Sequence, residues 1–256
     1  MMSYLSLTLS LSFVGLAMLI SFWQRLKLER DLFIGTVRAF IQLTAVGYLL
    51  KFIFNLASWQ YVALMLGVMV LVAGQNAARR AEGLPNAFFL VAPAIAVAET
   101  ITLGMLVGLG IIPFTPQYVI PISGMIIGNA MVASGLTLNR LRAEITARRA
   151  AILTTLALGG TSRQAAEPAL KAAVKAGMIP TVDSMKTVGL VQLPGMMTGQ
   201  IIAGISPVEA VKYQILVQFM LSASVGITSM LVALFGYRLF FTSAHQLRLP
   251  STNPSR

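Results

Sequence analysis

The sequence predicts an all-α membrane protein that crosses the bilayer about seven times. Two features of composition point to this class. Apolar residues make up 57% of the 256 residues and charged residues only 11%, against about 25% in soluble domains. So few charges cannot cover that much apolar surface in water, whereas a bilayer removes the need to cover it. The third observation is that the apolar residues fall into runs of membrane-spanning length.

Seven apolar runs approach or exceed the roughly 20 residues that a transmembrane helix needs. In chain order they are residues 5–23, 32–53, 59–74, 87–109, 118–138, 187–205 and 211–235. A short uncharged turn with Pro113 and Pro116 separates the fourth run from the fifth. Pro207 separates the sixth from the seventh, because proline ends one helix and can begin the next. The whole chain, 1–256, is expected to form a single transmembrane domain.

The basic residues predict how these runs are oriented in the membrane. If the runs alternate in direction, most Lys and Arg side chains fall on one side, after runs one, three, five and seven. The other side holds only Lys51 and Lys212. Cytoplasmic loops collect Lys and Arg, so the N-terminus is predicted to face outward and the C-terminus to lie in the cytoplasm. The same bias accounts for the formal charge of +11, and nucleic acid is not an expected partner because no aromatic base-stacking platform accompanies the charges.

The segment between runs five and six, residues 139–186, is predicted to lie in the cytoplasm as a helix, a turn and a second helix. It is too short to have a core of its own. Gly159 and Gly160 are expected to break the first helix, and Thr161 or Ser162 to cap the second. The second helix is expected to end near residues 177–180, where a glycine and a proline follow one another closely.

An apolar stripe on this second helix includes Leu170 and Val174, since residues four apart share one face. Two interpretations of the stripe are open. In one, the helix rests on the lipid surface. In the other, it inserts the stripe into a groove of a soluble partner. A break between two helices in the longest loop favours a protruding, partner-binding element.

Two intramembrane segments share the pattern Gly-Met-x-x-Gly followed by a carboxamide residue. The members are Gly124, Gly128 and Asn129 in the fifth run, and Gly195, Gly199 and Gln200 in the sixth. Glycines four apart let helix backbones approach closely, so the four glycines are predicted to pack these two helices together. Glycine- or proline-interrupted spans also mark the substrate sites of transporters. An intramembrane carboxamide must find a hydrogen-bond partner or line a water-filled path. Asn129 and Gln200 are therefore candidates for a substrate path.

Three further residues are candidates for the same path. Met125 and Met196 lie within the two patterned segments, and thioether sulfur binds soft metals, although methionine also fills cores. Glu99 lies in the middle of the fourth run, where a charge is a functional candidate by default. The structural alternative is an ion pair between Glu99 and Arg38 of the second run.

Several kinds of chemistry are not expected in this chain. It has no cysteine, and its single histidine, His245, lies in the polar C-terminal tail, so no site built from these residues is predicted. A Gly-x-x-x-x-Gly-Lys-Ser/Thr loop is also missing, so the chain cannot hold ATP by a P-loop. We therefore expect a protein without enzymatic activity or a cofactor of its own, and the residues do not assign metal ligands.

Three stretches resemble a known family closely: IPISGMI at residues 120–126, IPTVDSMKTVGL at 179–190 and LPGMMTG at 193–199. With these motifs the chain resembles the FetB-type permease family. Its members are the membrane subunits of bacterial iron-export ABC transporters, with plant relatives linked to aluminium tolerance. The resemblance extends over nearly the whole chain and is densest in residues 119–214.

The resemblance implies a multi-pass permease in the cell inner (plasma) membrane that exports iron or a related metal species. It implies a permease homodimer and a separate cytoplasmic ATPase chain that binds ATP and Mg. The stretch LALGGTS at residues 156–162 is similar to the Ala-Leu-Gly-Ala-Ser coupling segment of ABC permeases, with Gly160 at the usual alanine. ATPase coupling is therefore expected at Gly159, Gly160, Leu170 and Val174.

The residues leave two other classes of protein open. One is a secondary transporter or channel that is driven by an ion gradient and uses Glu99 as its proton or cation site. The other is a membrane-embedded partner protein without transport activity. An ABC permease requires the ATPase for transport, whereas a secondary transporter requires only the gradient.

Overall fold

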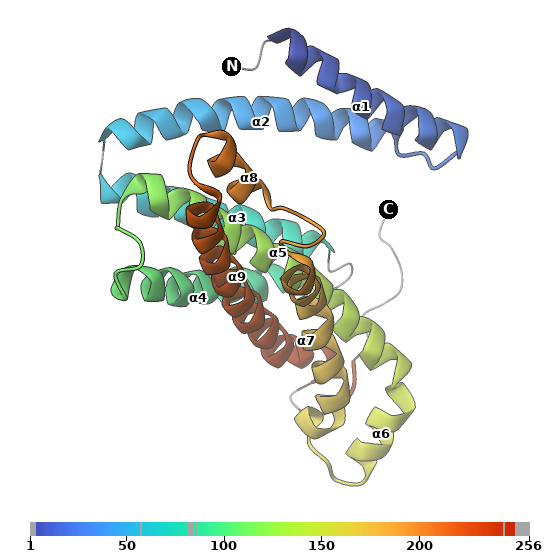
Figure 1. Ribbon diagram of the computed structural model, residues 1–256. Coiled ribbons are helices and arrows are strands. Elements are labelled where there is room, and N and C mark those ends of the chain that lie inside the picture. Colours follow the sequence, from blue (N-terminus) through green and yellow to red (C-terminus); the bar gives the residue numbers. More distant parts are fainter. Residues whose placement is uncertain (1–3, 57, 81–83, 85, 243, 249–256) are drawn as a thin grey trace. The chain divides into compact units, whose positions relative to one another are not determined.

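The computed structural model of the chain is almost entirely helical and describes residues 4–56, 58–80, 84, 86–242 and 244–248 (Figure 1). The helices group into two compact units, Met1–Ser58 and Trp59–Arg256. Extended pairing within the described residues is limited to isolated bridges between Val188 and Gln192 and between Phe241 and Leu247. The predicted all-α class is confirmed.

The first unit is a pair of helices, α1 (Tyr4–Trp23) and α2 (Glu29–Leu56), which contact each other. The turn between them is held by Ser21, which is 2% exposed. Its hydroxyl donates to the Glu29 carboxylate at 2.8 Å and accepts from the Leu28 amide at 3.1 Å. The second bond satisfies a backbone amide at the start of α2 that has no partner within the helix.

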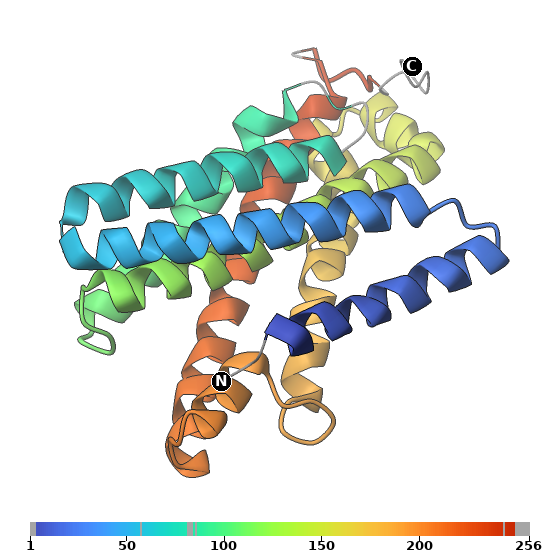
Figure 2. The same cartoon turned by 90° about the horizontal axis from the view of Figure 1, so that it is seen from above.

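The second unit is a bundle around one long helix, α5. Its helices are α3 (Trp59–Arg80), α4 (Ala87–Gly108), α5 (Pro116–Ala147), α6 (Arg149–Ala157), α7 (Ser162–Thr187), α8 (Gly195–Ile202) and α9 (Pro207–Gly236), followed by the 3-10 helix η1 (Tyr237–Phe240). Helix α5 packs against α3, α4, α7 and α9, and α9 packs in turn against α4, α7 and α8. Helices α7 and α9 can be followed beside each other in both views (Figures 1 and 2), and α5 crosses them in Figure 2.

Five described helical segments are long and apolar enough to cross a membrane. They are Glu29–Phe54, Trp59–Arg80, Ala87–Gly108, Pro116–Ala147 and Pro207–Phe240, and α1 adds a shorter apolar segment, Leu9–Trp23. These segments correspond to six of the predicted runs and support a multi-pass membrane fold. Which side of the membrane each loop faces stays a prediction, and Met1 lies outside the described residues.

The sixth predicted span, residues 187–205, is wrong as a continuous helix. Helix α7 runs up to Thr187, residues 188–194 then form a bridged turn, and α8 is only 8 residues long. Gly189 has φ +83° in this turn, a conformation that glycine adopts without strain. Pro194 follows as the N-cap residue of α8. Hydropathy alone predicted one continuous helix through this turn because nearly all residues of the turn are apolar.

The end predicted for the second cytoplasmic helix is also wrong, because α7 continues through Gly177 and Pro180 to Thr187. The reason lies in packing. A Cβ at Gly177 would collide with the Thr137 hydroxyl of α5 and would lie 2.6 Å from the Ser229 hydroxyl of α9. The glycine thus lets three helices approach, and this contact outweighs the single helix hydrogen bond that a proline removes. The later part of α7 therefore lies beside residues that were predicted to be inside the fifth span.

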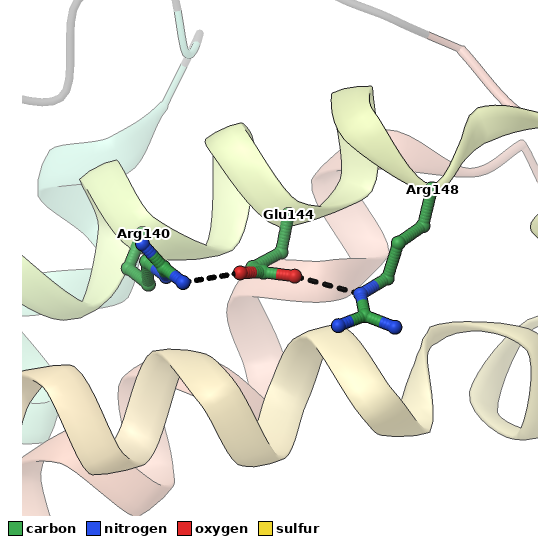
Figure 3. A network of polar contacts seen from close by, with 3 residues as sticks. All are labelled: Arg140, Glu144 and Arg148. Carbon is green, nitrogen blue, oxygen red and sulfur yellow. Dashed lines mark hydrogen bonds and ion pairs between the residues drawn. The ribbon is translucent and has the colours of Figure 1, made fainter.

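The first cytoplasmic helix was predicted to be separate from span five. Instead α5 runs for 32 residues to Ala147, and α6 begins at Arg149. Glu144 stabilises this last part of α5 by pairing with Arg140 at 2.6 Å and with Arg148 at 2.7 Å (Figure 3). Both pairs join residues four apart on one helix face. At about 1.5 Å per residue, α5 is longer than a bilayer crossing requires.

The core of the second unit consists of two apolar clusters. The α6-side cluster is the larger one and includes Ile95, Leu138 and Val232. The α8-side cluster is made of Leu106, Ile112, Ile122, Ile126, Val217 and Met220. Helices α4, α5 and α9 contribute to both clusters and therefore fix the position of everything that lies between them.

Candidate functional site

A cavity of about 420 Å³ opens beside the α8-side cluster, between the first halves of α5 and α9 and helix α8. Its wall is mainly apolar, with a few polar and sulfur-containing side chains. These are Gln117, Tyr118, Met125, Met196, Gln200, Tyr213 and Met220. Pro121 also lines the cavity and lies inside α5, where it leaves one carbonyl without its usual helix partner.

Three residues that were predicted to form a substrate path meet in this cavity. Met125 comes from α5, whereas Met196 and Gln200 come from α8, and both methionines pack against the α8-side cluster. The Oε1 atom of Gln200 is buried and has no hydrogen-bond partner among the described residues. A buried amide oxygen without a partner is costly, so this atom is available to a ligand or to water in the cavity.

The other two predicted path residues lie elsewhere. Asn129 is exposed and its side chain donates to the Met125 carbonyl at 2.9 Å. Glu99 is 5% exposed and lies inside α4, outside the residues that line the cavity. The shared pattern in runs five and six therefore does not place its two carboxamides at one site within a single chain.

The four patterned glycines do not form a close helix contact within the chain. A Cβ at Gly128, Gly195 or Gly199 would have no neighbour within 4 Å, and one at Gly124 would only touch the Met69 side chain of α3 at 3.4 Å. The glycine surfaces of α5 and α8 are therefore open in one chain. The predicted packing of the two patterned helices against each other through these glycines is not seen within one chain.

The turn between α6 and α7, residues 158–161, is tightly built. Thr161 forms a capping box with Gln164: the Gln164 amide donates to the Thr161 hydroxyl at 3.3 Å, and the Thr161 amide donates to the Gln164 side chain at 2.8 Å. The predicted cap is thus confirmed at Thr161. Gly159 has φ +85°, and a Cβ at Gly160 would lie 2.8 Å from the Thr155 carbonyl oxygen. These contacts explain why glycine occupies a position where the similar coupling segment of ABC permeases usually has alanine.

The apolar stripe of α7 is less open than expected. Leu170 is 7% exposed and belongs to the α6-side cluster, and Val174 packs against that cluster. Both also line a groove of about 850 Å³ that α7 forms with Met230 and Leu234 of α9. Lys171, which pairs with Glu167 at 2.6 Å beside this groove, lowers the pKa of Glu167. The stripe therefore packs mainly against the core of the bundle, and a partner can contact it only through the groove.

Sequence reasoning missed two features of the α6–α7 turn. Leu158 is 84% exposed, although the sequence placed it within a helix. His245 of the C-terminal tail lies against the start of α7, with its Nδ1 atom 3.1 Å from the Ser162 hydroxyl. No local sequence pattern predicts a contact between two residues that are 83 positions apart. The only sign in the sequence was an apolar residue, Leu158, placed directly before two glycines.

The fold and the cavity define a multi-pass α-helical membrane protein with a partly apolar, methionine-containing site between its helices. Comparison with known proteins makes the assignment more specific. Residues 4–241 match the model of the family described as Uncharacterised protein family (UPF0014). The chain belongs to this family, and no solved structure matches it.

Three relatives show what this family includes. UPF0014 membrane protein YjkA of Bacillus subtilis is 45% identical over 96% of this chain and 99% of the relative. The Probable iron export permease protein FetB of Escherichia coli is 45% identical over 94% of this chain and 93% of the relative. Protein ALUMINUM SENSITIVE 3 of Arabidopsis thaliana is 40% identical over 92% of this chain and 86% of the relative. The family resemblance inferred from the motifs is confirmed.

Proposed function

We propose that the chain is the membrane permease subunit of an ATP-driven exporter whose substrate is iron or a related metal species. The observation that carries this proposal is the cavity in which Met125, Met196 and Gln200 converge. The name of the E. coli relative, a probable iron export permease, supports the same substrate class. The permease works in the cell inner membrane and has no catalytic activity of its own.

The cavity offers a mixture of ligands that suits a passing metal. Met125, Met196 and Met220 supply thioether sulfur, which is a weak ligand for soft metal ions, and Gln200 supplies an amide oxygen. The cavity includes no carboxylate among its lining residues. Neutral ligands hold a metal less tightly than charged ones, and a transported ion must be able to leave.

The partner chain is a cytoplasmic ATPase that binds ATP and Mg and contacts the α6–α7 turn. The turn fits this role because its capping box and the close contact at Gly160 hold it firmly. Leu158 is 84% exposed at the turn and provides an apolar contact point. Gly159 and Gly160 shape the turn, while Leu170 and Val174 support it from the core and groove of α7.

A second copy of the permease completes the translocation path. The open space beside Gly128, Gly195 and Gly199 supports this arrangement, since small residues without a neighbour allow another helix to approach. Asn129 is exposed on the same helix as Gly128. In the homodimer this side chain would face the joint path rather than the lipid.

The first prediction tests the cavity. Replacing both Met125 and Met196 with Leu keeps apolar volume and removes only sulfur, and Q200A removes the unpartnered oxygen. In inverted membrane vesicles that contain permease and ATPase, each variant should reduce ATP-dependent uptake of radioactive iron by about tenfold, the effect of losing about 1.4 kcal/mol of ligand binding. Assembly with the ATPase, measured by copurification, should be unchanged.

The control is M131L, because Met131 packs against the α6-side cluster and lies outside the cavity. Full uptake by the double methionine variant would exclude thioether ligands, and full uptake by Q200A as well would exclude the cavity as the path. Uptake that continues with an inactive ATPase and follows an ion gradient would instead identify a secondary transporter. The buried carboxyl of Glu99 is the feature that favours that second function.

A further inference from the structure

Helices α4 and α9 carry polar residues between the two apolar clusters of the core. On α4 the buried stripe reads Ile95, Glu99, Thr102 and Leu106, with spacings of three and four residues that keep all of them on one face. Ile95 belongs to the α6-side cluster and Leu106 to the α8-side cluster. Glu99 and Thr102 therefore lie in the layer between the clusters.

The facing helix α9 repeats this arrangement in the opposite direction. Val217 belongs to the α8-side cluster and Val232 to the α6-side cluster, with Ser224 and Thr228 between them. Helices α4 and α9 contact each other, and a Cβ at Gly236 would touch the Leu90 side chain at 3.4 Å. One end of the α4 stripe thus lies beside one end of the α9 stripe in each apolar cluster. The polar residues of both stripes therefore lie in the same layer of the bundle, between the clusters.

Helix α5 adds a fifth polar residue, Ser123, which interacts with the Glu99 carboxyl without reaching ordinary hydrogen-bond geometry. We call Glu99, Thr102, Ser123, Ser224 and Thr228 the buried oxygen cluster. All five are at most 5% exposed. None of their side-chain oxygens has a hydrogen-bond partner among the described residues.

Many other helical hydroxyls of this chain donate to the carbonyl four residues earlier, as Thr100 does to Ala96 at 2.8 Å and Ser134 does to Ala130 at 2.8 Å. The hydroxyls of the buried oxygen cluster do not make this local bond. They are instead left available inside the bundle, where an unmade hydrogen bond costs the most.

We propose that the buried oxygen cluster binds one Na⁺ ion between α4, α5 and α9. Glu99 is the only charged side chain among the buried residues that the structure describes. An uncompensated carboxylate at this depth is strongly unfavourable. One monovalent cation makes the site neutral, whereas a divalent ion would leave one excess positive charge.

The oxygens distinguish Na⁺ from a proton. A proton on Glu99 neutralises the charge, but it allows the carboxyl to donate only one hydrogen bond and leaves most of the cluster without a partner. A metal ion accepts several oxygens at once. Carboxylate and hydroxyl oxygens are hard ligands, and the cluster holds no sulfur or nitrogen, which suits a hard cation.

The site is separate from the cavity beside α8, so it does not depend on the proposed export function. It gives Glu99 a role that differs from the substrate path. A cation that links α4, α5 and α9 would stabilise the layer between the two apolar clusters, and the permease can be tested for it without an ATPase or a transported metal.

The experiment measures Na⁺ binding to the purified permease in lipid nanodiscs. Radioactive Na⁺ should bind saturably, with about one ion per chain, in choline buffer of constant ionic strength. Thermal melting should rise with Na⁺ concentration, as it does for any ligand that binds the folded state alone, and K⁺ at the same concentration should produce a smaller rise. E99Q should abolish the Na⁺-dependent rise.

Two further variants keep the test valid if E99Q fails to fold. T102V and T228V remove one hydroxyl each and preserve the carboxyl, and each should weaken Na⁺ binding by about tenfold, as expected for the loss of one ligand to a charged group. The matched control is S134A, because the buried Ser134 hydroxyl is already bonded to Ala130. S134A should bind Na⁺ like the unmodified protein.

Three results would overturn the proposal. One is the absence of saturable Na⁺ binding, which would mean that a proton alone neutralises Glu99. Another is a melting shift that choline or K⁺ reproduces in full, since this would reflect ionic strength. The third is unchanged Na⁺ affinity in both T102V and T228V, which would remove the cluster from the site.

Discussion

Two glycine-containing turns, one between α6 and α7 and the other between α7 and α8, are built differently. The α6–α7 turn is held by the Thr161–Gln164 capping box, by close contact at Gly160 and by His245 from the tail. The α7–α8 turn is held only locally, by its bridge between Val188 and Gln192 and by the Gln192 side chain, which donates to the Ser184 hydroxyl at 3.3 Å. Leu190 and Val191 are 88% and 82% exposed there, and a Cβ at Gly189 or Gly195 would touch nothing.

The difference shows that glycine can occur in a turn for two opposite reasons, a lack of space for a side chain or a surface left open to a neighbour. At Gly160 the missing side chain is a steric requirement, because the Thr155 carbonyl occupies the space. Beside α8 the missing side chains leave free space in which another helix can pack. A firm turn suits the transfer of force from a partner, and an open turn suits a part of the permease that contacts a second chain or moves during transport.

The largest expected effect comes from G160A. The added methyl group would lie 2.7 Å from the Thr155 side chain and 2.8 Å from its carbonyl oxygen, so the backbone must shift. We expect a loss of about 1–3 kcal/mol in stability, typical of overpacking, measured as a lower melting temperature in detergent. Unchanged melting would show that the turn adjusts freely and would remove the contrast with the α7–α8 turn.

A smaller effect is expected from T161A, which removes the N-cap of α7. The loss of the bond that the Gln164 amide donates to the Thr161 hydroxyl should cost about 1 kcal/mol and lower the melting temperature less than G160A does. T154A is the control, since the Thr154 hydroxyl bonds only to the Ala150 carbonyl on α6 at 3.0 Å. Equal melting of T161A and T154A would mean that the cap does not fix the turn.

The smallest effect on stability is expected from G195A, which makes the same change as G160A at the open turn. No atom lies within 4 Å of the new methyl group, and alanine favours a helix over glycine by up to about 1 kcal/mol. The melting temperature should therefore stay the same or rise slightly. A clear fall would indicate that a second chain already occupies this space, and crosslinking at Gly195→Cys in the cysteine-free chain would then test that contact.

Hydropathy was sufficient to predict α1 to α5 and α9, because their apolar surfaces face either lipid or the core. It failed for α7 and α8 because it cannot distinguish an apolar turn from an apolar helix. Helix α7 is polar in composition and contains Pro168 and Pro180, so no sequence pattern predicted that it extends to Thr187. Its length depends on the contact of Gly177 with Thr137 and Ser229, which are distant in sequence.

The candidate site was predictable to a similar extent. The repeated Gly-Met pattern directed attention to Met125, Met196 and Gln200, and the structure brings these three together. It could not reveal that Asn129 faces outward, because a helix position alone does not determine what covers it. The buried oxygen cluster was also missed. The sequence singled out Glu99 alone, because Thr102, Ser224 and Thr228 are ordinary residues in apolar helices until the packing is known.

The contact between His245 and Ser162 affects how complexes of this protein should be isolated. A tail that reaches the α6–α7 turn lies at the surface where the ATPase is proposed to bind, so an affinity tag fused to the C-terminus extends a segment that already contacts this surface. Such a fusion can weaken the complex that it is meant to capture. Attaching the tag to the ATPase leaves this segment of the permease unchanged.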